Sequence, residues 1–117
     1  MVGYKPQLPV LSAPTIEEIV RRIVRAADPW KIVLFGSRAR GDNRAESDID
    51  LLVIADSSLP RHLRAVPLYA ALVGLPVEVD TEVMVYTPTE VTQWQGVQSA
   101  FVTTALREGR VLYEKRP

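Results

Sequence analysis

Residues 31–54 read KIVLFGSRARGDNRAESDIDLLVI, which is two short apolar runs joined by a polar loop. The first run ends at a glycine-serine pair, Gly36 and Ser37. Ten residues later an Asp-x-Asp, Asp48 and Asp50, opens the second run. Short runs of aliphatic and β-branched residues bounded by Gly and Asp predict buried strands. We therefore expect a tight turn and two carboxylates to meet at the ends of two neighbouring strands.

The two aspartates have the spacing of residues that share one face of a strand. Residues two apart project together, roughly 6.6 Å from one another along the backbone. Carboxylate oxygens combined with phosphate oxygens are the ligands that Mg²⁺ prefers. Two such ions about 4 Å apart can activate an attacking oxygen and stabilise a leaving one. Asp48 and Asp50 are therefore candidate metal ligands.

The glycine-serine turn is a candidate phosphate site. A glycine at position 36 lets a phosphate approach the backbone closely, and Ser37 adds a hydroxyl to the N–H groups of the turn. Arg38 and Arg40 can add positive charge toward a triphosphate. A lone Asp-x-Asp is usually solvated and a lone Gly-Ser is usually only a turn. Their occurrence in this order between two strands predicts nucleotide-dependent phosphoryl chemistry.

A third carboxylate is expected on the predicted strand 77–86. Glu78, Asp80 and Glu82 alternate there with valines, so the three acidic residues share a face. One of them can complete the metal site and act as general base toward an acceptor hydroxyl. At least one of the three must simply be solvated.

The remaining elements follow from periodicity and capping signals. We expect an extended tail over 1–13 and one mixed α/β (α+β) domain over 14–117, with a small mixed β-sheet flanked by helices. Capping boxes are predicted at Thr15 with Glu18 and at Thr87 with Glu90. The other expected elements are a helix ending at Asp28-Pro29, a helical turn over 37–41, a helix over 60–73 with a kink or late start at Pro67, a helix over 97–107 and a strand over 110–113.

Bulk composition excludes several function classes. The 117 residues carry 14 basic and 14 acidic side chains and no cysteine. Zero net charge argues against nucleic-acid binding as the function, and the lack of cysteine excludes disulfides and thiolate metal sites. No segment approaches the roughly 20 apolar residues of a membrane span, so we expect a cytoplasmic protein. Arg61 and Arg64 are expected on a solvated outer face.

Residues 31–54 resemble the signature of the DNA polymerase β-like nucleotidyltransferases, most closely the minimal nucleotidyltransferase (MNT) group. Gly36, Ser37, Asp48 and Asp50 fit that family's pattern at every position. The resemblance implies the nucleotidyltransferase fold, Mg²⁺ (two ions), and transfer of a nucleoside monophosphate from an NTP, with ATP and AMP expected, with loss of pyrophosphate. It also implies nucleotide binding by Gly36, Ser37, Arg38 and Arg40.

The resemblance has one departure. Small members carry a third aspartate five residues before the Thr-Pro of the next helix, and that position is Glu82, with Asp80 as the nearby alternative. The implied catalytic and metal-binding set is therefore Asp48, Asp50 and Glu82.

Many MNT proteins pair with a small helical HEPN-domain protein in toxin–antitoxin modules, and some attach AMP to it. The resemblance thus implies an antitoxin that modifies a HEPN partner. The alternative is a catalytically weak nucleotide-binding module that masks this partner by forming a complex. Transfer to a small molecule is less well supported, because enzymes of that kind carry an extra helical domain. The sequence leaves the oligomeric state open, a homo-oligomer included.

Overall fold

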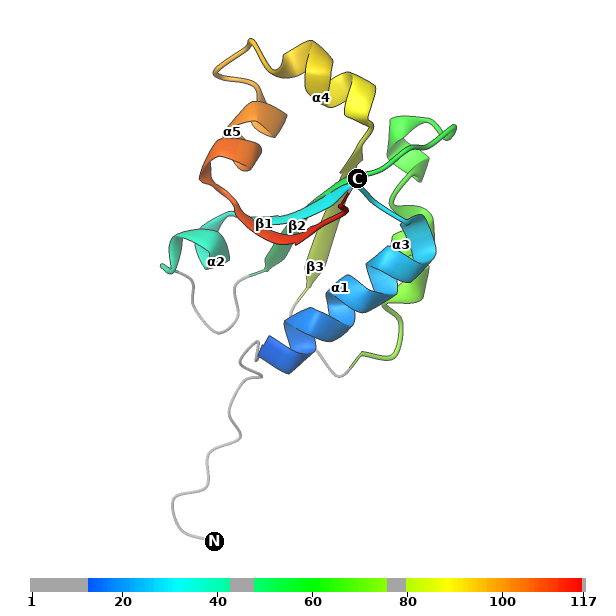
Figure 1. Cartoon of the computed structure of the whole chain (residues 1–117). Coiled ribbons are helices and arrows are strands. Elements are labelled where there is room, and N and C mark those ends of the chain that lie inside the picture. Colours follow the sequence, from blue (N-terminus) through cyan, green and yellow to red (C-terminus); the bar gives the residue numbers. More distant parts are fainter. Residues whose placement is uncertain (1–12, 43–47, 76–79, 117) are drawn as a thin grey trace, which may run out of the picture.

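The computed structural model describes residues 13–42, 48–75 and 80–116 (Figure 1). Helices and strands alternate along most of the chain. The elements are α1 (Ala13–Ala27), β1 (Lys31–Phe35), α2 (Ser37–Arg40), β2 (Ile49–Ile54), the 3₁₀ turn η1 (Arg61–Leu63), α3 (Val66–Ala71), β3 (Thr81–Tyr86), α4 (Pro88–Trp94), α5 (Phe101–Glu108) and β4 (Arg110–Glu114). Among the described residues, no helix is long and apolar enough to cross a bilayer.

The four strands form one mixed sheet in the order β3-β2-β1-β4. β1 is antiparallel to both β2 and β4, whereas β2 is parallel to β3. The β1–β2 and β2–β3 pairs bring the end of β1 and the starts of β2 and β3 to the same edge of the sheet. This edge therefore receives both the glycine-serine turn and the carboxylates of β2 and β3.

Helices cover both faces of the sheet, with α1 and α3 on one side and α4 and α5 on the other (Figure 1). Alternate residues of each strand point to opposite faces. Ile49, Leu51 and Val53 of β2 pack in the core beneath α1 and α3. Leu52 packs in the second core with Val102 and Ala105 of α5. This burial on both sides explains the uninterrupted apolar run of β2 and confirms the predicted mixed α/β fold.

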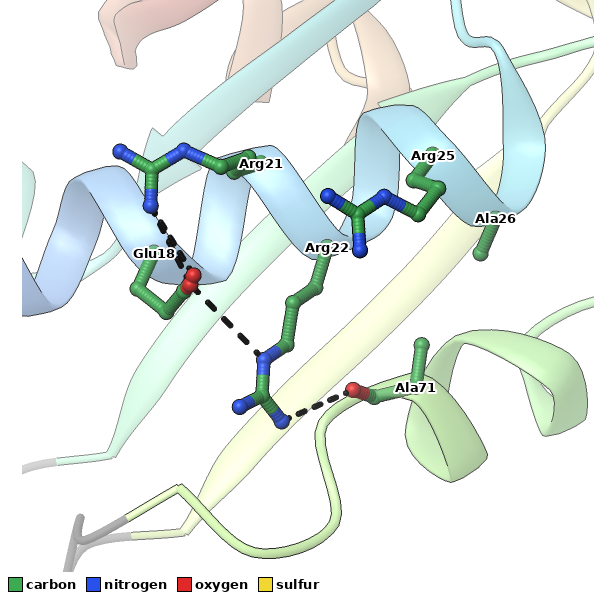
Figure 2. A pocket seen from close by; sticks show the side chains of 6 residues that line it. All are labelled: Glu18, Arg21, Arg22, Arg25, Ala26 and Ala71. Carbon is green, nitrogen blue, oxygen red and sulfur yellow. Dashed lines mark hydrogen bonds and ion pairs between the residues drawn. The ribbon is translucent and has the colours of Figure 1, made fainter.

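Arg22 of α1 bonds to the end of α3, as Figure 2 shows for its bond to Ala71. Arg22 donates hydrogen bonds to the carbonyls of Ala71 (3.2 Å) and Val73 (3.0 Å). These carbonyls belong to the last turn of α3 and the residues after it, where a helix leaves acceptors without partners. Glu18 pairs with Arg21 on the same side of α1 at 2.9 Å. Arg22 therefore has a structural role in holding the end of α3 against α1.

Several predicted boundaries are confirmed. β1 ends at Phe35 before Gly36, α2 follows at once, and β4 occupies the predicted last strand. Pro67 lies in the first turn of α3, so the expected late start is observed. The Thr87–Glu90 capping box forms in full: Glu90 N–H donates to Thr87 Oγ1, and Thr87 N–H donates to Glu90 Oε1.

Other boundaries differ from the prediction. The capping box at Thr15 is wrong, because α1 already begins at Ala13 and Thr15 lies inside it. Proline is tolerated in a first turn, so Pro14 does not delay the helix. Helix α5 begins at Phe101 and not at residue 97, since residues 95–100 form turns. β3 begins at Thr81, and residues 76–79, with Glu78, lie outside the described part of the chain. Of the tail predicted over 1–13, residues 1–12 also lie outside it, and Ala13 already belongs to α1.

The expectation for Arg64 is also wrong. Its side chain is only 11% exposed and donates to Glu90 Oε1 at 2.6 Å, while the more exposed Arg61 reaches Glu90 Oε2 at 3.0 Å. Burial raises the pKa of Glu90, but hydrogen bonds from Arg64, Thr87 and Arg61 outweigh it and lower this pKa to about 2. The end of β3 and the start of α4 are thus linked to η1 by a charged cluster.

Candidate active site

Gly36 forms the turn between β1 and α2 in a conformation that other residues avoid. Its φ of 76° and ψ of −156° lie in a region that is essentially restricted to glycine. A Cβ at this position would lie 2.6 Å from Asp50 Oδ2. Glycine is therefore favoured at this position for two reasons. Its backbone angles are unfavourable for other residues, and the Asp50 carboxylate occupies the space that a Cβ would need.

The turn after Gly36 is closed by backbone hydrogen bonds. The N–H groups of Ala39 and Arg40 donate to the Gly36 carbonyl at 3.1 and 3.2 Å. The N–H groups of Gly41 and Asp42 donate to the Ser37 carbonyl at 3.0 and 3.2 Å, and Gly41 ends the turn in the left-handed conformation. These bonds hold Ser37 at the head of a defined turn next to the Asp50 carboxylate.

Asp50 and Glu82 are neighbours on parallel strands. Asp50 pairs with Glu82 in the β2–β3 register and with Phe35 in the β1–β2 register. Partial burial raises the pKa of Asp50, as do the charges of Glu82 and Asp48 and a hydrogen bond with the Glu82 carboxyl. Arg38 acts in the opposite direction and favours the charged form of Asp50.

The structure distinguishes the two candidates for the third carboxylate. Glu82 lies within β3 opposite Asp50. Asp80 precedes the strand, is exposed, and contributes its backbone carbonyl, which accepts a hydrogen bond from Ile49 N–H at 2.9 Å. Asp48 is exposed immediately before β2. The carboxylates that the fold brings together around Asp50 are therefore those of Glu82 and Asp48.

The donor chemistry of this cluster suits a hard divalent cation, because all of its ligand atoms are carboxylate oxygens. Within the described ranges, no group of three or more His, Cys, Asp or Glu side chains is already arranged to hold a metal ion. Magnesium is usually held by one or two carboxylates together with substrate phosphates and water, and not by a complete protein cage. The Asp50–Glu82 pair fits that mode of binding.

The two arginines have different surroundings. Arg38 is half-buried and close enough to Asp50 to affect its pKa. Arg40 is exposed and pairs with Asp42 at 3.3 Å. Arg40 also lines a cavity of about 140 Å³ between α2 and α5, together with Phe35, Gly36 and a face of α5. No local pattern in the sequence predicts this cavity, because it depends on the distant α5 packing beside the turn.

The sequence is similar to known nucleotidyltransferases. Residues 17–117 match the family described as "Polymerase beta, Nucleotidyltransferase". Two proteins of Methanocaldococcus jannaschii, both named as candidate protein adenylyltransferases, are similar in sequence. MJ0604 is 34% identical over 83 residues, covering 71% of this chain and 77% of the relative. MJ1379 is 35% identical over 81 residues, covering 62% and 81%.

Two solved structures share the fold. A candidate nucleotidyltransferase from Sulfolobus solfataricus aligns with a TM-score of 0.60 at 19% identity, over 87% of this chain and 79% of that one. A toxin–antitoxin structure with AMP-PNP aligns with a TM-score of 0.54 at 21% identity, over 86% and 74%. The family match spans the turn, the Asp-x-Asp and Glu82, so the chain belongs to the polymerase β-like nucleotidyltransferases and is a minimal nucleotidyltransferase enzyme.

Proposed function

We propose that this nucleotidyltransferase moves AMP from ATP to a hydroxyl of a partner protein. The observation that carries the proposal is the contact of the Asp50 carboxylate with the Gly36 turn, with Glu82 beside it. A phosphate turn and a carboxylate pair at one edge of the sheet are the two halves of a phosphoryl-transfer site. The relatives named as candidate protein adenylyltransferases support AMP and a protein acceptor.

The residues of the site fall into a phosphate-binding group and a metal-binding group. Gly36 and Ser37 receive the triphosphate on the backbone and hydroxyl of the turn, and Arg38 and Arg40 add positive charge. Asp48, Asp50 and Glu82 would hold Mg²⁺, with two ions expected. When bound, the metal would offset the negative charge that develops on the phosphate oxygens.

The reaction is a substitution at the α-phosphorus. The acceptor oxygen forms a bond to this phosphorus, the bond to the β-phosphate oxygen breaks, and pyrophosphate leaves with the electron pair. The acceptor proton passes to a carboxylate of the cluster. Glu82 is the residue suited to this step, because it adjoins Asp50 and lies on the exposed edge strand.

We infer that the partner is a HEPN-domain toxin and that the chain is its antitoxin. The similar fold of a toxin–antitoxin structure with AMP-PNP supports this assignment. A cytoplasmic setting follows from such a partnership.

A second candidate is a nucleotide-binding module that masks the partner without modifying it. The feature that favours it is the glutamate at the third carboxylate position. An error near 1 Å in the position of a catalytic group can lower a rate by about 100-fold. In that case binding would remain and catalysis would be weak.

The test is transfer of label from α-³²P-ATP to a co-expressed HEPN protein in the presence of Mg²⁺. The parent chain should label the partner, and the Asp50→Asn variant should not. Asp56→Asn is the matched control, because Asp56 follows β2 and its carboxylate accepts from Trp30 Nε1. A stable complex that forms without label transfer, equally with parent and Asp50→Asn, would select the masking module instead.

A further inference from the structure

A small cavity lies between α2 and α5, directly beside the glycine turn; we call it the α2–α5 pocket. Its volume is about 140 Å³. Phe35 and Gly36 line it from the end of β1, and Arg40 lines it from α2. Phe101, Thr104, Ala105 and Glu108 complete the lining. Their spacing of three, four and seven residues places them on one face of α5.

The pocket and the carboxylate cluster share Gly36. The Asp50 carboxylate lies where a Cβ of Gly36 would be, and Gly36 also lines the pocket. A molecule with its phosphates on this turn can therefore place its uncharged end in the pocket. The pocket is thus positioned for the part of a nucleotide that the carboxylates and the turn do not contact.

The walls of the pocket offer an aromatic surface. Phe35 and Phe101 pack edge to face, with ring centroids 5.1 Å apart and an interplanar angle of 79°. Phe101 remains 39% exposed although it contacts a second ring, that of Tyr86. An aromatic ring with an uncovered face is the surface on which nucleobases stack, and a larger base covers more of it.

The rim of the pocket offers hydrogen-bonding groups of opposite kinds. The Glu108 carboxylate only accepts, and the Arg40 guanidinium only donates. Each is held by an exposed ion pair, Glu108 with Arg107 at 3.4 Å and Arg40 with Asp42 at 3.3 Å. Exposed pairs of this kind contribute little to stability, so a ligand can replace them. A base with an amino group and a ring nitrogen acceptor satisfies both residues.

We propose that the α2–α5 pocket holds the nucleobase of the NTP and favours an amino-bearing purine over uracil. The inference rests on the proposed function and adds to it the part of the chain that selects the base. A purine covers more of the Phe101 ring than a pyrimidine does. Uracil would place a carbonyl oxygen, which cannot donate a hydrogen bond, next to the Glu108 carboxylate, which can only accept one. UTP should therefore bind more weakly than ATP.

The experiment compares ATP, UTP and tripolyphosphate, which lacks a base, by calorimetry in Mg²⁺ buffer. The parent should bind ATP about tenfold or more tighter than either UTP or tripolyphosphate. The Thr104→Trp variant fills the pocket and should lose about tenfold in ATP affinity, with tripolyphosphate affinity unchanged. Thr103→Trp is the matched control, since it makes the same substitution at a neighbouring threonine of α5 that lies outside the pocket lining.

A second variant keeps the inference testable if Thr104→Trp does not fold, which circular dichroism will show. Glu108→Gln preserves shape and should reduce the ATP-to-UTP preference, again without changing tripolyphosphate binding. A parent that binds tripolyphosphate as tightly as ATP, or a folded Thr104→Trp that binds ATP like the parent, overturns the pocket assignment alone. A parent that binds neither ATP nor tripolyphosphate overturns the proposed function as well.

Discussion

The Asp50 carboxylate occupies the position that a side chain at residue 36 would need, with Oδ2 only 2.6 Å from an ideal Cβ on Gly36. This contact joins the end of β1 to the start of β2 at the sheet edge where Glu82 also lies. Because Gly36 has no Cβ, the Asp50 carboxylate has room to lie against the turn. The same relationship explains why the turn and the Asp-x-Asp occur together in the sequence.

The Gly36→Ala variant should be destabilised and inactive. A non-glycine residue in this backbone region costs roughly 1–3 kcal/mol, and the clash with Asp50 adds to that cost. Gly41→Ala is the control, because its φ of 83° is also positive but nothing lies within 4 Å of an added Cβ. We expect a loss of about 3 kcal/mol or more for Gly36→Ala and about 1 kcal/mol for Gly41→Ala, measured by urea unfolding. Equal losses would show that the Asp50 contact is unimportant.

The Asp50→Asn variant should be more stable than the parent in buffer without divalent cations. Burial and the nearby Glu82 and Asp48 raise the pKa of Asp50, so its charged form is disfavoured in the folded state at neutral pH. The amide removes that cost. Thermal unfolding at pH 7 checks this, with Asp56→Asn as the exposed control.

Addition of Mg²⁺ should make the parent more stable than the Asp50→Asn variant. A cation at tenfold its dissociation constant stabilises the parent by about 1.4 kcal/mol and leaves Asp50→Asn nearly unchanged. If both proteins respond equally to Mg²⁺, then Asp50 is not a ligand of the ion.

Glu82→Gln should remove most nucleotidyl transfer, whereas Asp80→Asn should retain it. Glu82 lies opposite Asp50, whereas Asp80 is exposed before β3 and contributes its backbone carbonyl to the β2–β3 contact. A loss of 100-fold or more is expected for Glu82→Gln, on the scale of a general base or metal ligand. Single-turnover rates with saturating ATP make the comparison. The opposite ranking would assign the third carboxylate to Asp80.

The charged cluster around Glu90 should make stability depend on pH in acid. The pKa of Glu90 is lowered to about 2 from the ordinary 4.5, so its stabilisation is present above pH 4.5. That stabilisation is lost as pH falls from about 4.5 toward about 2. Arg64→Ala should cost roughly 1–3 kcal/mol at pH 7, because it leaves a largely buried carboxylate with fewer partners.

Arg61→Ala should cost under about 1 kcal/mol, because Arg61 is 54% exposed and its pair with Glu90 is screened by water. The difference between the two arginine variants should shrink as pH approaches 2. Chemical denaturation across pH 2–7 provides the measurement. A pH-independent difference would mean that packing, and not charge, is what Arg64 contributes.

Local patterns were sufficient for the parts of the fold that neighbouring residues determine. The β1 run, the Gly36 turn, the β2 run and the Thr87–Glu90 capping box were all predicted from residues at most a few positions apart. Local patterns were not sufficient at Thr15 and at the start of α5. The capping signature at Thr15 and the apolar spacing before Phe101 are each compatible with more than one helix start.

By itself, the sequence determined the glycine turn, the two strands around it and the pair of aspartates, because turn angles and strand alternation are set within a few residues. The tertiary structure decided that Glu82 and not Asp80 lies opposite Asp50, since that depends on the parallel register of β2 and β3. It also decided that Arg64 is buried against Glu90 and that α5 forms a pocket beside Gly36. These contacts join residues 26 to 72 positions apart, and only the strand register and the packing of helices on the sheet bring them together.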